Sequence, residues 1–418
     1  MHNQWCLLVV VFGLLGFHEP LLGRKKNKRV DPPITSEQLP VQQECIVDFP
    51  ECDQIKEKAY HIRVLLSEQL LDVDKASWCW EFKSSTGFFL ADSVTGSKRM
   101  KSAQMKLRIS AKEGFFYIND KKVQQKEFLL KAQDGHISFQ DRAYGGSFFL
   151  TINDKRNRCY LINMVDLEEY VCSVLKSEGW PGWPLEMNKV LAITSRTYAL
   201  AMMQGARDNK RIYDLKSTNA HQTYHGAHAQ QILKKAVDAT KGLFVGYQGN
   251  PIIAMFDICC GGVVPAHIEG FDFGRAPYLA RDYACTYCKD CSSYHWSFSL
   301  GKSDLIAHLQ KDYPQLTTLR EFKITKKDKA GLVCEARAKG VRTTLALTGR
   351  KLYSLFKEIK SYCFGVQKKG NAIIFSGRGF GHHIGLCQWG ARAMVRDGWD
   401  YRNILAYYYP GTKLMKLG

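Results

Sequence analysis

The sequence predicts an α+β fold, in which an antiparallel β region precedes a helical catalytic core and a smaller α/β appendage. Short apolar runs separated by turn residues fill positions 60–163, two helical patterns flank an aromatic loop at 179–184, and mixed patterns occupy 303–360. Turn residues at near-regular intervals are typical of antiparallel sheets, whereas apolar residues three and four positions apart indicate helices.

The β region is predicted from nine short runs, several of which alternate apolar and polar residues. The dipeptides that separate them include Asn119-Asp120, Asp134-Gly135, Gly145-Gly146 and Asn153-Asp154, which favour tight turns. The predicted strands are His61–Leu66, Trp78–Phe82, Gly87–Leu90, Met105–Ile109, Gly114–Ile118, Glu127–Ala132, Ile137–Phe139, Ser147–Ile152 and Cys159–Asn163.

Two helices are predicted around the loop at 179–184. The first buries Leu167, Val171 and Val174, and it ends at Glu178 because Gly179 and two prolines follow. The second begins after Pro184, a position that proline tolerates, and runs to about residue 203. Farther on, a helix is expected at about 227–240, a hairpin at 243–258 and another helix through residue 394.

Glu178 is the candidate catalytic residue. It stands beside Trp180, Pro181 and Trp183, and a carboxyl group packed against indole rings loses hydration, which raises its pKa and suits it to donate a proton. The same aromatic rings offer surfaces on which a sugar ring stacks, so Trp180 and Trp183 are candidate substrate-binding residues. The alternative is a solvated glutamate at a helix end, next to two core tryptophans.

The charge of the chain points to an anionic partner. Its 418 residues include 59 Lys and Arg against 40 Asp and Glu, a formal net charge of +19, and its hydrophobic content of 45% indicates a globular protein. The basic residues are scattered and no nucleic-acid-binding motif accompanies them. An acidic polymer such as cell-wall glycan, or an anionic membrane surface, is therefore favoured over nucleic acid.

The N-terminal region predicts export. Residues 1–23 contain the apolar run LLVVVFGLLGF, which is short for a membrane span and fits a signal peptide or an N-terminal anchor, although its basic cluster follows the run. Residues 24–58 read as a linker, and residues 59–418 as the catalytic region. We expect a periplasmic or cell-envelope protein that contacts a membrane only through its N-terminal segment.

Among the 14 cysteines, Cys285, Cys288 and Cys291 have a C-x2-C-x2-C spacing, and Cys260 lies upstream. Two residues between thiols let both reach one tetrahedral metal ion, so these four are candidate ligands of a structural zinc ion, with His225 or His267 as an extra ligand. Disulfides and unpaired thiols are the alternatives. No cofactor is required by the chemistry predicted for Glu178.

Two further residues carry open alternatives. Arg196 lies in an apolar helix and must be paired, so it either forms an intramolecular ion pair or contacts substrate. His382 follows three glycines of the segment Gly377–Gly385, which implies close backbone approach by a ligand or another segment. His382 is either a polar site residue or a structural histidine.

Taken together, these motifs resemble the family of stage II sporulation protein D and the amidase enhancers. The residues that match are Leu167, Glu168, Tyr170, Val174, Ser177, Glu178, Trp183, Pro184, Glu186, Lys189, Arg196-Thr-Tyr-Ala, Cys259-Cys-Gly-Gly, Gly379-Phe-Gly-His-His-Ile-Gly-Leu-Cys-Gln-Trp-Gly-Ala and Tyr408-Tyr-Pro-Gly-Thr. The chain departs from the family pattern at Gly179-Trp180-Pro181, at Leu191, at His383 in place of glycine and at Cys387 in place of serine.

The resemblance implies a lytic transglycosylase that cleaves the MurNAc–GlcNAc bond of peptide-stripped peptidoglycan and leaves anhydro-MurNAc ends. It implies that Glu178 is the general acid and then the base, and that Arg196, Tyr198, His382 and Gln388 line or support the cleft. Glycan strands are the expected partner, together with a cell-wall amidase. The alternatives are a non-catalytic glycan-binding enhancer of an amidase and, ranked last, a zinc-dependent hydrolase that uses the cysteine loop.

Overall fold

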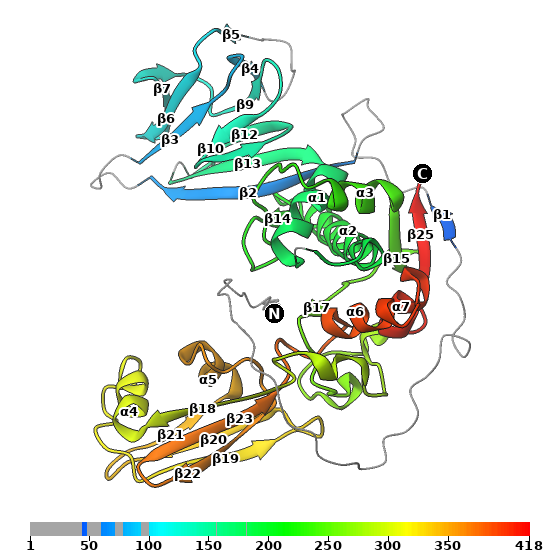
Figure 1. Cartoon of the computed structure of the whole chain (residues 1–418). Coiled ribbons are helices and arrows are strands. Elements are labelled where there is room, and N and C mark those ends of the chain that lie inside the picture. The colour runs from blue at the N-terminus through cyan, green and yellow to red at the C-terminus, as the bar shows by residue number, and fades with distance from the viewer. Residues whose placement is uncertain (1–43, 48–59, 72–77, 93–99, 156, 181) are drawn as a thin grey trace. The chain divides into compact units, whose positions relative to one another are not determined.

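A computed structural model describes residues 44–47, 60–71, 78–92, 100–155, 157–180 and 182–418 (Figure 1). The described chain divides into two compact units, residues 46–244 with 416–418 and residues 245–415 with 44–45. The predicted signal peptide or anchor and nearly all of the predicted linker lie outside the described residues, as does Pro181. Helices and antiparallel sheets occur together, which confirms the predicted α+β class.

The first unit begins with two packed sheets, and all nine predicted strands are present in them (Figure 1). The seven-stranded sheet has the order β14-β2-β13-β12-β9-β4-β5 and the six-stranded sheet the order β11-β10-β3-β6-β7-β8. Their strands are β2 (His61–Leu70), β3 (Cys79–Lys83), β4 (Phe88–Asp92), β5 (Met100–Ser102), β6 (Lys106–Lys112), β7 (Phe115–Ile118), β8 (Lys121–Val123), β9 (Glu127–Ala132), β10 (Ile137–Phe139), β11 (Arg142–Tyr144), β12 (Ser147–Ile152), β13 (Arg158–Asp166) and β14 (Leu215–Lys216).

Phenylalanine rings fill the space between the two sheets. Phe82 of β3 lies 5.4 Å from Phe148 of β12, and Phe116 of β7 lies 5.2 Å from Phe128 of β9, as measured between ring centroids. Each ring is buried, and alternation along the strands brings these residues to the inner faces. The predicted turns also form: Asn119 and Asp120 both have positive φ, as a two-residue hairpin turn requires.

Three helices pack beside the end of β13: α1 (Leu167–Glu178), α2 (Leu185–Asp208) and α3 (Gln231–Ala239). The bounds predicted at Glu178 and after Pro184 are confirmed. Helix α3 begins four residues later than predicted because the N–H groups before it form hydrogen bonds outside the helix. The Ala227 N–H donates to the Ala143 carbonyl, and the Gln230 N–H donates to the His228 ring.

The second unit contains an α/β region with its own core. Buried residues from Trp296 to Phe375 pack between two three-stranded sheets, β18-β23-β22 and β19-β20-β21, and two helices. The elements are β18 (His295–Gly301), α4 (Lys302–Gln310), β19 (Glu321–Lys327), β20 (Val333–Lys339), β21 (Thr344–Leu347), α5 (Gly349–Leu355), β22 (Phe364–Lys369) and β23 (Ala372–Arg378). The predicted appendage, residues 303–360, thus shares its core with β18, β22 and β23.

The remainder of the second unit surrounds a cysteine-rich loop. Its elements are β17 (Phe256–Asp257), the short 3-10 helices η2 (Pro265–His267), η3 (Pro277–Leu279) and η4 (Tyr287–Asp290), β24 (Leu386–Cys387), α6 (Gln388–Arg396) and α7 (Tyr401–Tyr408). A further sheet has the order β1-β25-β15-β16 and comprises β1 (Glu44–Val47), β15 (Leu243–Tyr247), β16 (Asn250–Pro251) and β25 (Lys413–Leu417).

The hairpin predicted at 243–258 is only partly correct. Strands β15 and β16 form its tip, but residues 252–255 are not a strand, and β17 pairs in parallel with β24. Asp257 is thereby paired with Cys387, far along the chain, which local patterning could not indicate.

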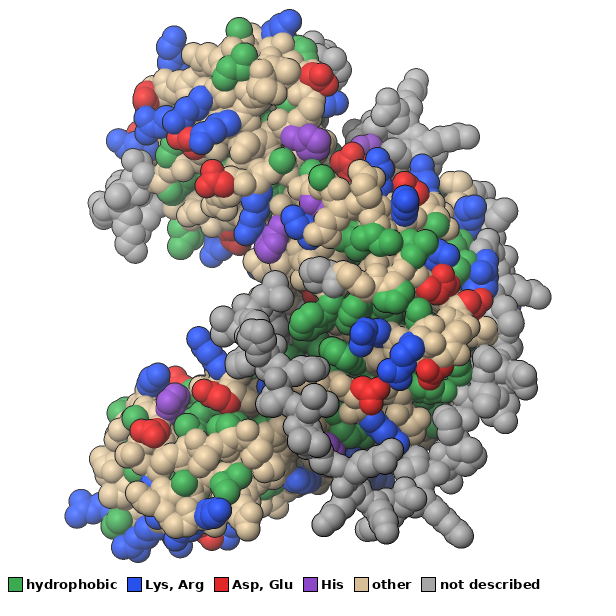
Figure 2. Space-filling model, viewed as in Figure 1, with side chains coloured by type: hydrophobic (Ala, Val, Ile, Leu, Met, Phe, Trp, Pro, Cys, Tyr) green, Lys and Arg blue, Asp and Glu red, His purple; other side chains and the backbone are tan. Residues whose placement is uncertain are grey.

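Lys and Arg side chains are dispersed among other residues on the face seen in Figure 2 and do not gather into one basic patch. Within the described ranges, no helix combines the length and the apolar character needed to cross a membrane.

Candidate functional site

Helix α1 brings Glu178 to its last position. The helix begins at Leu167 because the Asp166 carboxylate accepts hydrogen bonds from the Glu168 and Glu169 N–H groups. It ends at Glu178 because Gly179 takes an extended conformation. Glu178 is partly exposed, so its carboxylate reaches the surface of the unit without being fully solvated.

A loop at residues 217–226 lies against this end of α1, and strand β14 sets its path. The buried Asp214 carboxylate forms an ion pair of 2.7 Å with Arg63 on β2, which fixes the chain just before β14 pairs with β2. Within the loop, the Thr223 N–H donates a hydrogen bond of 2.7 Å to Glu178 Oε1. The backbone of the loop therefore orients one carboxylate oxygen of Glu178.

A buried tyrosine layer supports the same contact. The Tyr170 hydroxyl donates to Gln222 Oε1 at 3.0 Å, and the Gln222 amide donates to the Ser195 carbonyl on α2. The Tyr170 ring stacks on Tyr224, whose hydroxyl donates to Asn163 Oδ1 at 2.7 Å. The loop is thus held by side chains of α1 and β13 and by the backbone of α2, which makes it a rigid partner for Glu178.

Tyr198 is the candidate residue most closely linked to Glu178. Its hydroxyl is buried and has no hydrogen-bond partner among the described residues. Burial raises the pKa of Tyr198, and the negative charge of Glu178 raises it further. The same charge contributes to the raised pKa of Tyr170, after burial and the charge of Tyr198. Both phenols are therefore neutral hydrogen-bond donors near the carboxylate.

His225 and Ser177 form the exposed side of this site. The Ser177 hydroxyl and His225 Nδ1 are 3.4 Å apart, and the His225 N–H donates to Ser173 Oγ at 3.2 Å. Burial lowers the pKa of His225, and the nearby charges of Arg142 and Lys176 lower it further. His225 is therefore a neutral, exposed imidazole, two positions beyond Thr223 in the same loop.

The two predicted tryptophans differ in exposure. Their rings are stacked with centroids 6.4 Å apart, yet Trp180 is 39% exposed and Trp183 only 7%. The Trp183 carbonyl accepts a hydrogen bond from the Asn188 amide, which ties the loop to α2. Trp180 therefore offers a ring face to a ligand, whereas Trp183 supports it from beneath.

Arg196, predicted as a substrate contact, instead takes the ion-pair alternative. Its side chain is fully buried, its Nε donates to Glu168 Oε1 at 2.9 Å, its Nη2 donates to Glu168 Oε2, and its Nη1 donates to the Leu243 carbonyl at 2.9 Å. Glu168 Oε1 also accepts the Gly242 N–H. All three guanidinium nitrogens are engaged within the protein, so Arg196 fixes α2 to α1 and has no exposed surface for a sugar.

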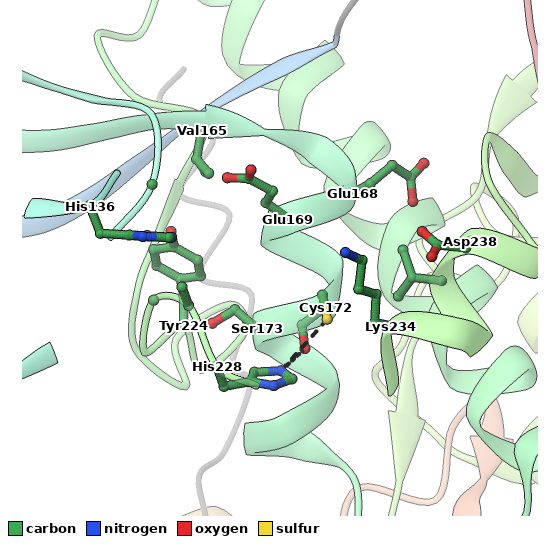
Figure 3. Close-up of a pocket in the computed structure, with 14 residues that line it drawn as sticks. His136, Val165, Glu168, Glu169, Cys172, Ser173, Tyr224, His228, Lys234 and Asp238 are labelled. Carbon is green, nitrogen blue, oxygen red and sulfur yellow. Dashed lines mark hydrogen bonds between the residues drawn. The ribbon is translucent and has the colours of Figure 1, made fainter. Parts of the chain in front are cut away.

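A separate pocket lies along the preceding turns of α1, and Figure 3 shows its lining. Cys172 and His228 meet there, with their Sγ and Nε2 atoms 3.7 Å apart. His228 Nε2 donates to the Cys172 carbonyl at 2.8 Å, its Nδ1 accepts from Gln230, and burial raises the pKa of the Cys172 thiol to about 11. A neutral thiol beside a fully bonded imidazole is not an activated nucleophile, so this pair is structural.

In the second unit, His382 and Gln388 lie on the segment that includes β24. Burial lowers the pKa of the partly exposed His382 to about 4, and its Nδ1 accepts the Ile384 N–H. Gln388 is buried at the start of α6 and has no exposed surface for a sugar. The substrate contact predicted for His382 therefore stays a prediction. The burial of Gln388 is a physical reason against a substrate contact by that residue.

His383 has a left-handed backbone, with φ of 67°. Its N–H donates to Asp257 Oδ2 at 2.8 Å and its Nδ1 bonds to the Cys260 carbonyl at 2.9 Å. The positive φ explains why glycine suits this position, and the two hydrogen bonds hold a non-glycine residue there.

The cysteine group differs from the predicted set in one member. Cys260, Cys285 and Cys288 converge as predicted, but the fourth sulfur is Cys387 and not Cys291. All four Sγ atoms lie within 4.8 Å of one another and are buried. Cys291 is not one of these four: its thiol interacts with Cys259, which in turn interacts with Cys288 and Cys387. The predicted extra ligands, His225 and His267, are not in this group of described residues either.

Comparison with known proteins defines the class. The family model described as stage II sporulation protein (SpoIID) matches residues 155–247, which include Glu178 and the 217–226 loop. A model of a domain of unknown function (DUF8618) matches residues 284–385. Together with the relatives below, these matches show that the chain belongs to the stage II sporulation protein D and amidase-enhancer family.

Three relatives bear this out. An uncharacterized protein of Brachyspira hyodysenteriae is 30% identical over 312 residues, which cover 71% of this chain and 79% of that protein. The amidase enhancer of Bacillus subtilis is 24% identical over 404 residues, 82% of this chain but 54% of that protein. The stage II sporulation protein D of Bacillus subtilis is 26% identical over 267 residues, 60% of this chain and 75% of that protein.

Several residues of the site were absent from the sequence predictions. Thr223, Gln222 and Tyr170 contribute a backbone N–H or a buried hydrogen bond, neither of which has a residue-type signature. Cys387 lies 99 positions beyond Cys288, outside the spacing of a short metal motif. The one feature of the sequence that could have indicated Cys387 is that a cysteine stands there where the family pattern has serine.

Proposed function

We propose that this protein is a lytic transglycosylase that cleaves the MurNAc–GlcNAc bond of peptidoglycan glycan strands, with Glu178 as the general acid and then the general base. The observation that carries the proposal is the partly exposed carboxylate at the end of α1, oriented by the Thr223 N–H. Family membership supports a role at the cell wall, since one relative is named an amidase enhancer.

The chemistry needs a single carboxyl group. Protonated Glu178 would give its proton to the glycosidic oxygen as the bond to C1 of MurNAc breaks, so that the leaving sugar departs as an alcohol. The resulting carboxylate would remove the proton from the 6-hydroxyl of the same MurNAc, and that oxygen would attack C1. The product is a 1,6-anhydro end, no water is consumed, and Glu178 ends protonated as it began.

The surroundings of Glu178 support these roles. The Thr223 N–H donates to Oε1, so the backbone of the loop orients the carboxyl group that would carry the proton. Tyr198 has a buried hydroxyl whose pKa is raised in part by the charge of Glu178, and Trp180, two positions beyond Glu178 in the chain, has an exposed ring. A ring face for stacking and an oriented proton donor are what cleavage of a glycosidic bond requires.

A peptidoglycan substrate would require the protein to act outside the cytoplasm. We propose export to the periplasm or cell envelope, supported by the apolar run at residues 7–17. The net charge of +19 would favour association with an anionic wall polymer.

The test compares Glu178→Gln with Glu186→Gln on peptide-stripped glycan strands. Glutamine keeps an amide oxygen that can accept the Thr223 N–H, so the loop should stay in place while the proton donor is lost. Loss of a general acid lowers rates by about 10²–10⁴-fold, or roughly 3–5 kcal/mol. Glu186 is the matched control because it lies on α2 and pairs with Lys189 at the surface, 2.9 Å away.

Mass spectrometry of released fragments measures anhydro-MurNAc ends. We expect wild type and Glu186→Gln to produce them at similar rates, and Glu178→Gln to bind glycan in a sedimentation assay without producing them. If the wild-type protein yields no anhydro ends, the enzyme proposal is wrong. If Glu178→Gln retains full activity, the assignment of the proton donor is wrong.

A second function is favoured by one comparison: the amidase enhancer of Bacillus subtilis aligns with 82% of this chain. On this alternative, the protein binds glycan without cleaving it and stimulates a cell-wall amidase. It predicts glycan binding with no anhydro ends, and amidase stimulation that Glu178→Gln leaves unchanged.

A further inference from the structure

The second unit contains a group of four buried cysteines that the proposed catalysis does not use. Cys260 follows β17, Cys285 precedes η4, Cys288 lies within η4, and Cys387 ends β24. We propose that these four thiolates bind one structural Zn²⁺ ion in a closed tetrahedral site.

The distances between the sulfurs fit this ion. With Zn–S bonds of about 2.3 Å, the sulfurs of a tetrahedral site lie about 3.8 Å apart. Cys260 Sγ and Cys288 Sγ are 3.7 Å apart, and all four Sγ atoms lie within 4.8 Å of one another. A disulfide needs about 2.05 Å, and none of these four cysteines forms one.

Hydrogen-bond donors surround the sulfurs as they do around bound thiolates. The N–H groups of Cys260 and Gly390 both point at Cys387 Sγ, at 3.2 and 3.3 Å, and the Tyr408 hydroxyl lies 3.2 Å from Cys285 Sγ. Such donors are weak partners for a neutral thiol but stabilise a negatively charged, metal-bound sulfur.

The close approach of α6 to the sulfurs depends on Gly390. A Cβ atom at this position would lie 2.1 Å from the Tyr408 hydroxyl and 2.8 Å from Cys285 Sγ. The backbone is therefore shaped to bring an N–H group against the cluster, which only glycine permits here.

A buried positive charge near the four cysteines would balance part of the negative charge of a zinc-bound site. Zn²⁺ with four thiolates has a net charge of −2, and Arg281, which is 1% exposed, interacts electrostatically with Cys260 and Cys285. Its Nε and Nη2 have no hydrogen-bond partner in the part of the chain that the structure describes. Its Nη1 donates to the Tyr283 carbonyl, and the guanidinium also interacts with the Asp257 carboxyl group. The negative charge of a zinc tetrathiolate would stabilise this buried cation further than four neutral thiols would.

The proposed site is structural and not catalytic. Each of the four cysteines is 1% exposed or less, so the tetrahedron leaves no open position for water or substrate. The ion would join β17, η4 and β24. Cys285 and Cys288 lie just inside the start of the region matched as a domain of unknown function, residues 284–385, and Cys387 lies just past its end. The zinc would thus fix both ends of that region together.

The first experiment uses the full-length wild-type protein, purified without chelators. Inductively coupled plasma mass spectrometry should find about one zinc per chain. Alkylation followed by peptide mass spectrometry should show Cys260, Cys285, Cys288 and Cys387 protected until the metal is removed, while exposed Cys79 reacts at once. Disulfides among the four, their rapid alkylation in the purified protein, or iron in place of zinc would overturn the proposal.

The second experiment compares two cysteine variants. Cys387→Ser should lose the zinc and the visible absorption bands of a tetrahedral cobalt tetrathiolate after cobalt substitution. Cys291→Ser should keep both, although Cys291 belongs to the same C-x2-C-x2-C run and is also buried. Equal loss in both variants would contradict the assignment. If Cys387→Ser does not fold, the alkylation pattern of the wild-type protein still tests whether these four cysteines bind the metal ion.

Discussion

The buried pair of Arg196 and Glu168 gives a prediction whose magnitude follows from the structure. Arg196 is fully buried, whereas the Glu168 side chain is 17% exposed. In Glu168→Gln the guanidinium keeps its bond to the Leu243 carbonyl but loses its only carboxylate within the described residues. Removing one partner of a buried ion pair costs about 3–5 kcal/mol, and the partial exposure of Glu168 favours the lower end.

The expected effect on the melting temperature follows from the size of the first unit. At roughly 2–4 °C per kcal/mol for a unit of this size, a loss of about 3 kcal/mol lowers the melting temperature by roughly 6–12 °C. Differential scanning calorimetry of the full chain measures this. Glu186→Gln is the matched control, because its pair with Lys189 is partly exposed and contributes about 0–1 kcal/mol.

The contrast between the two variants tests the reasoning. A glutamine at either position is nearly the same size as the glutamate, so packing changes little and the difference reports the charge. If Glu168→Gln melts no lower than Glu186→Gln, the ion pair does not hold α1 to α2 as we infer. The prediction would then fail whatever the activity of the variant.

Three further predictions concern the Glu178 site. Trp180→Ala should weaken glycan binding roughly tenfold, about 1.4 kcal/mol, without changing the melting temperature; unchanged binding would exclude stacking on its 39% exposed ring. Tyr198→Phe should lower the rate of anhydro-end formation about tenfold yet leave stability within about 1 kcal/mol, and a large drop in melting temperature would show a structural role. Burial lowers the pKa of His221 from 6.5 to about 4, and its neutral Nδ1 accepts the Lys216 N–H. The unfolded chain therefore binds the proton first, so stability is constant above about pH 6.5 and falls by up to ~3 kcal/mol toward pH 4; His221→Asn should flatten that slope in melts across this range.

Much of the first unit was predictable because its signals are local. The alternation of Lys106–Lys112 and the turn at Asn119-Asp120 depend on residues a few positions apart. The end of α1 at Glu178 follows from the glycine after it, since the residues next in sequence decide whether a helix continues. For the same reason, the candidate proton donor could be selected before its surroundings were known.

Other features depended on residues that are distant in the chain. Arg196 had to be paired, yet its partner Glu168 lies 28 positions away, so the sequence left ion pair and substrate contact open. Trp180 and Trp183 are similar in sequence, but only the packing of the loop against α2 exposes one and buries the other.

The sequence by itself determined the α+β class, the end of α1 at Glu178 and the start of α2 after Pro184, the family pattern and three of the four converging cysteines. The tertiary structure alone decided that Thr223 orients Glu178, that Arg196 is internal and that Cys387 completes the sulfur group. The physical reason is that periodicity and turn preference act between near neighbours. Ion pairs, buried hydrogen bonds and metal-ligand sets instead join segments that only the folded chain brings together.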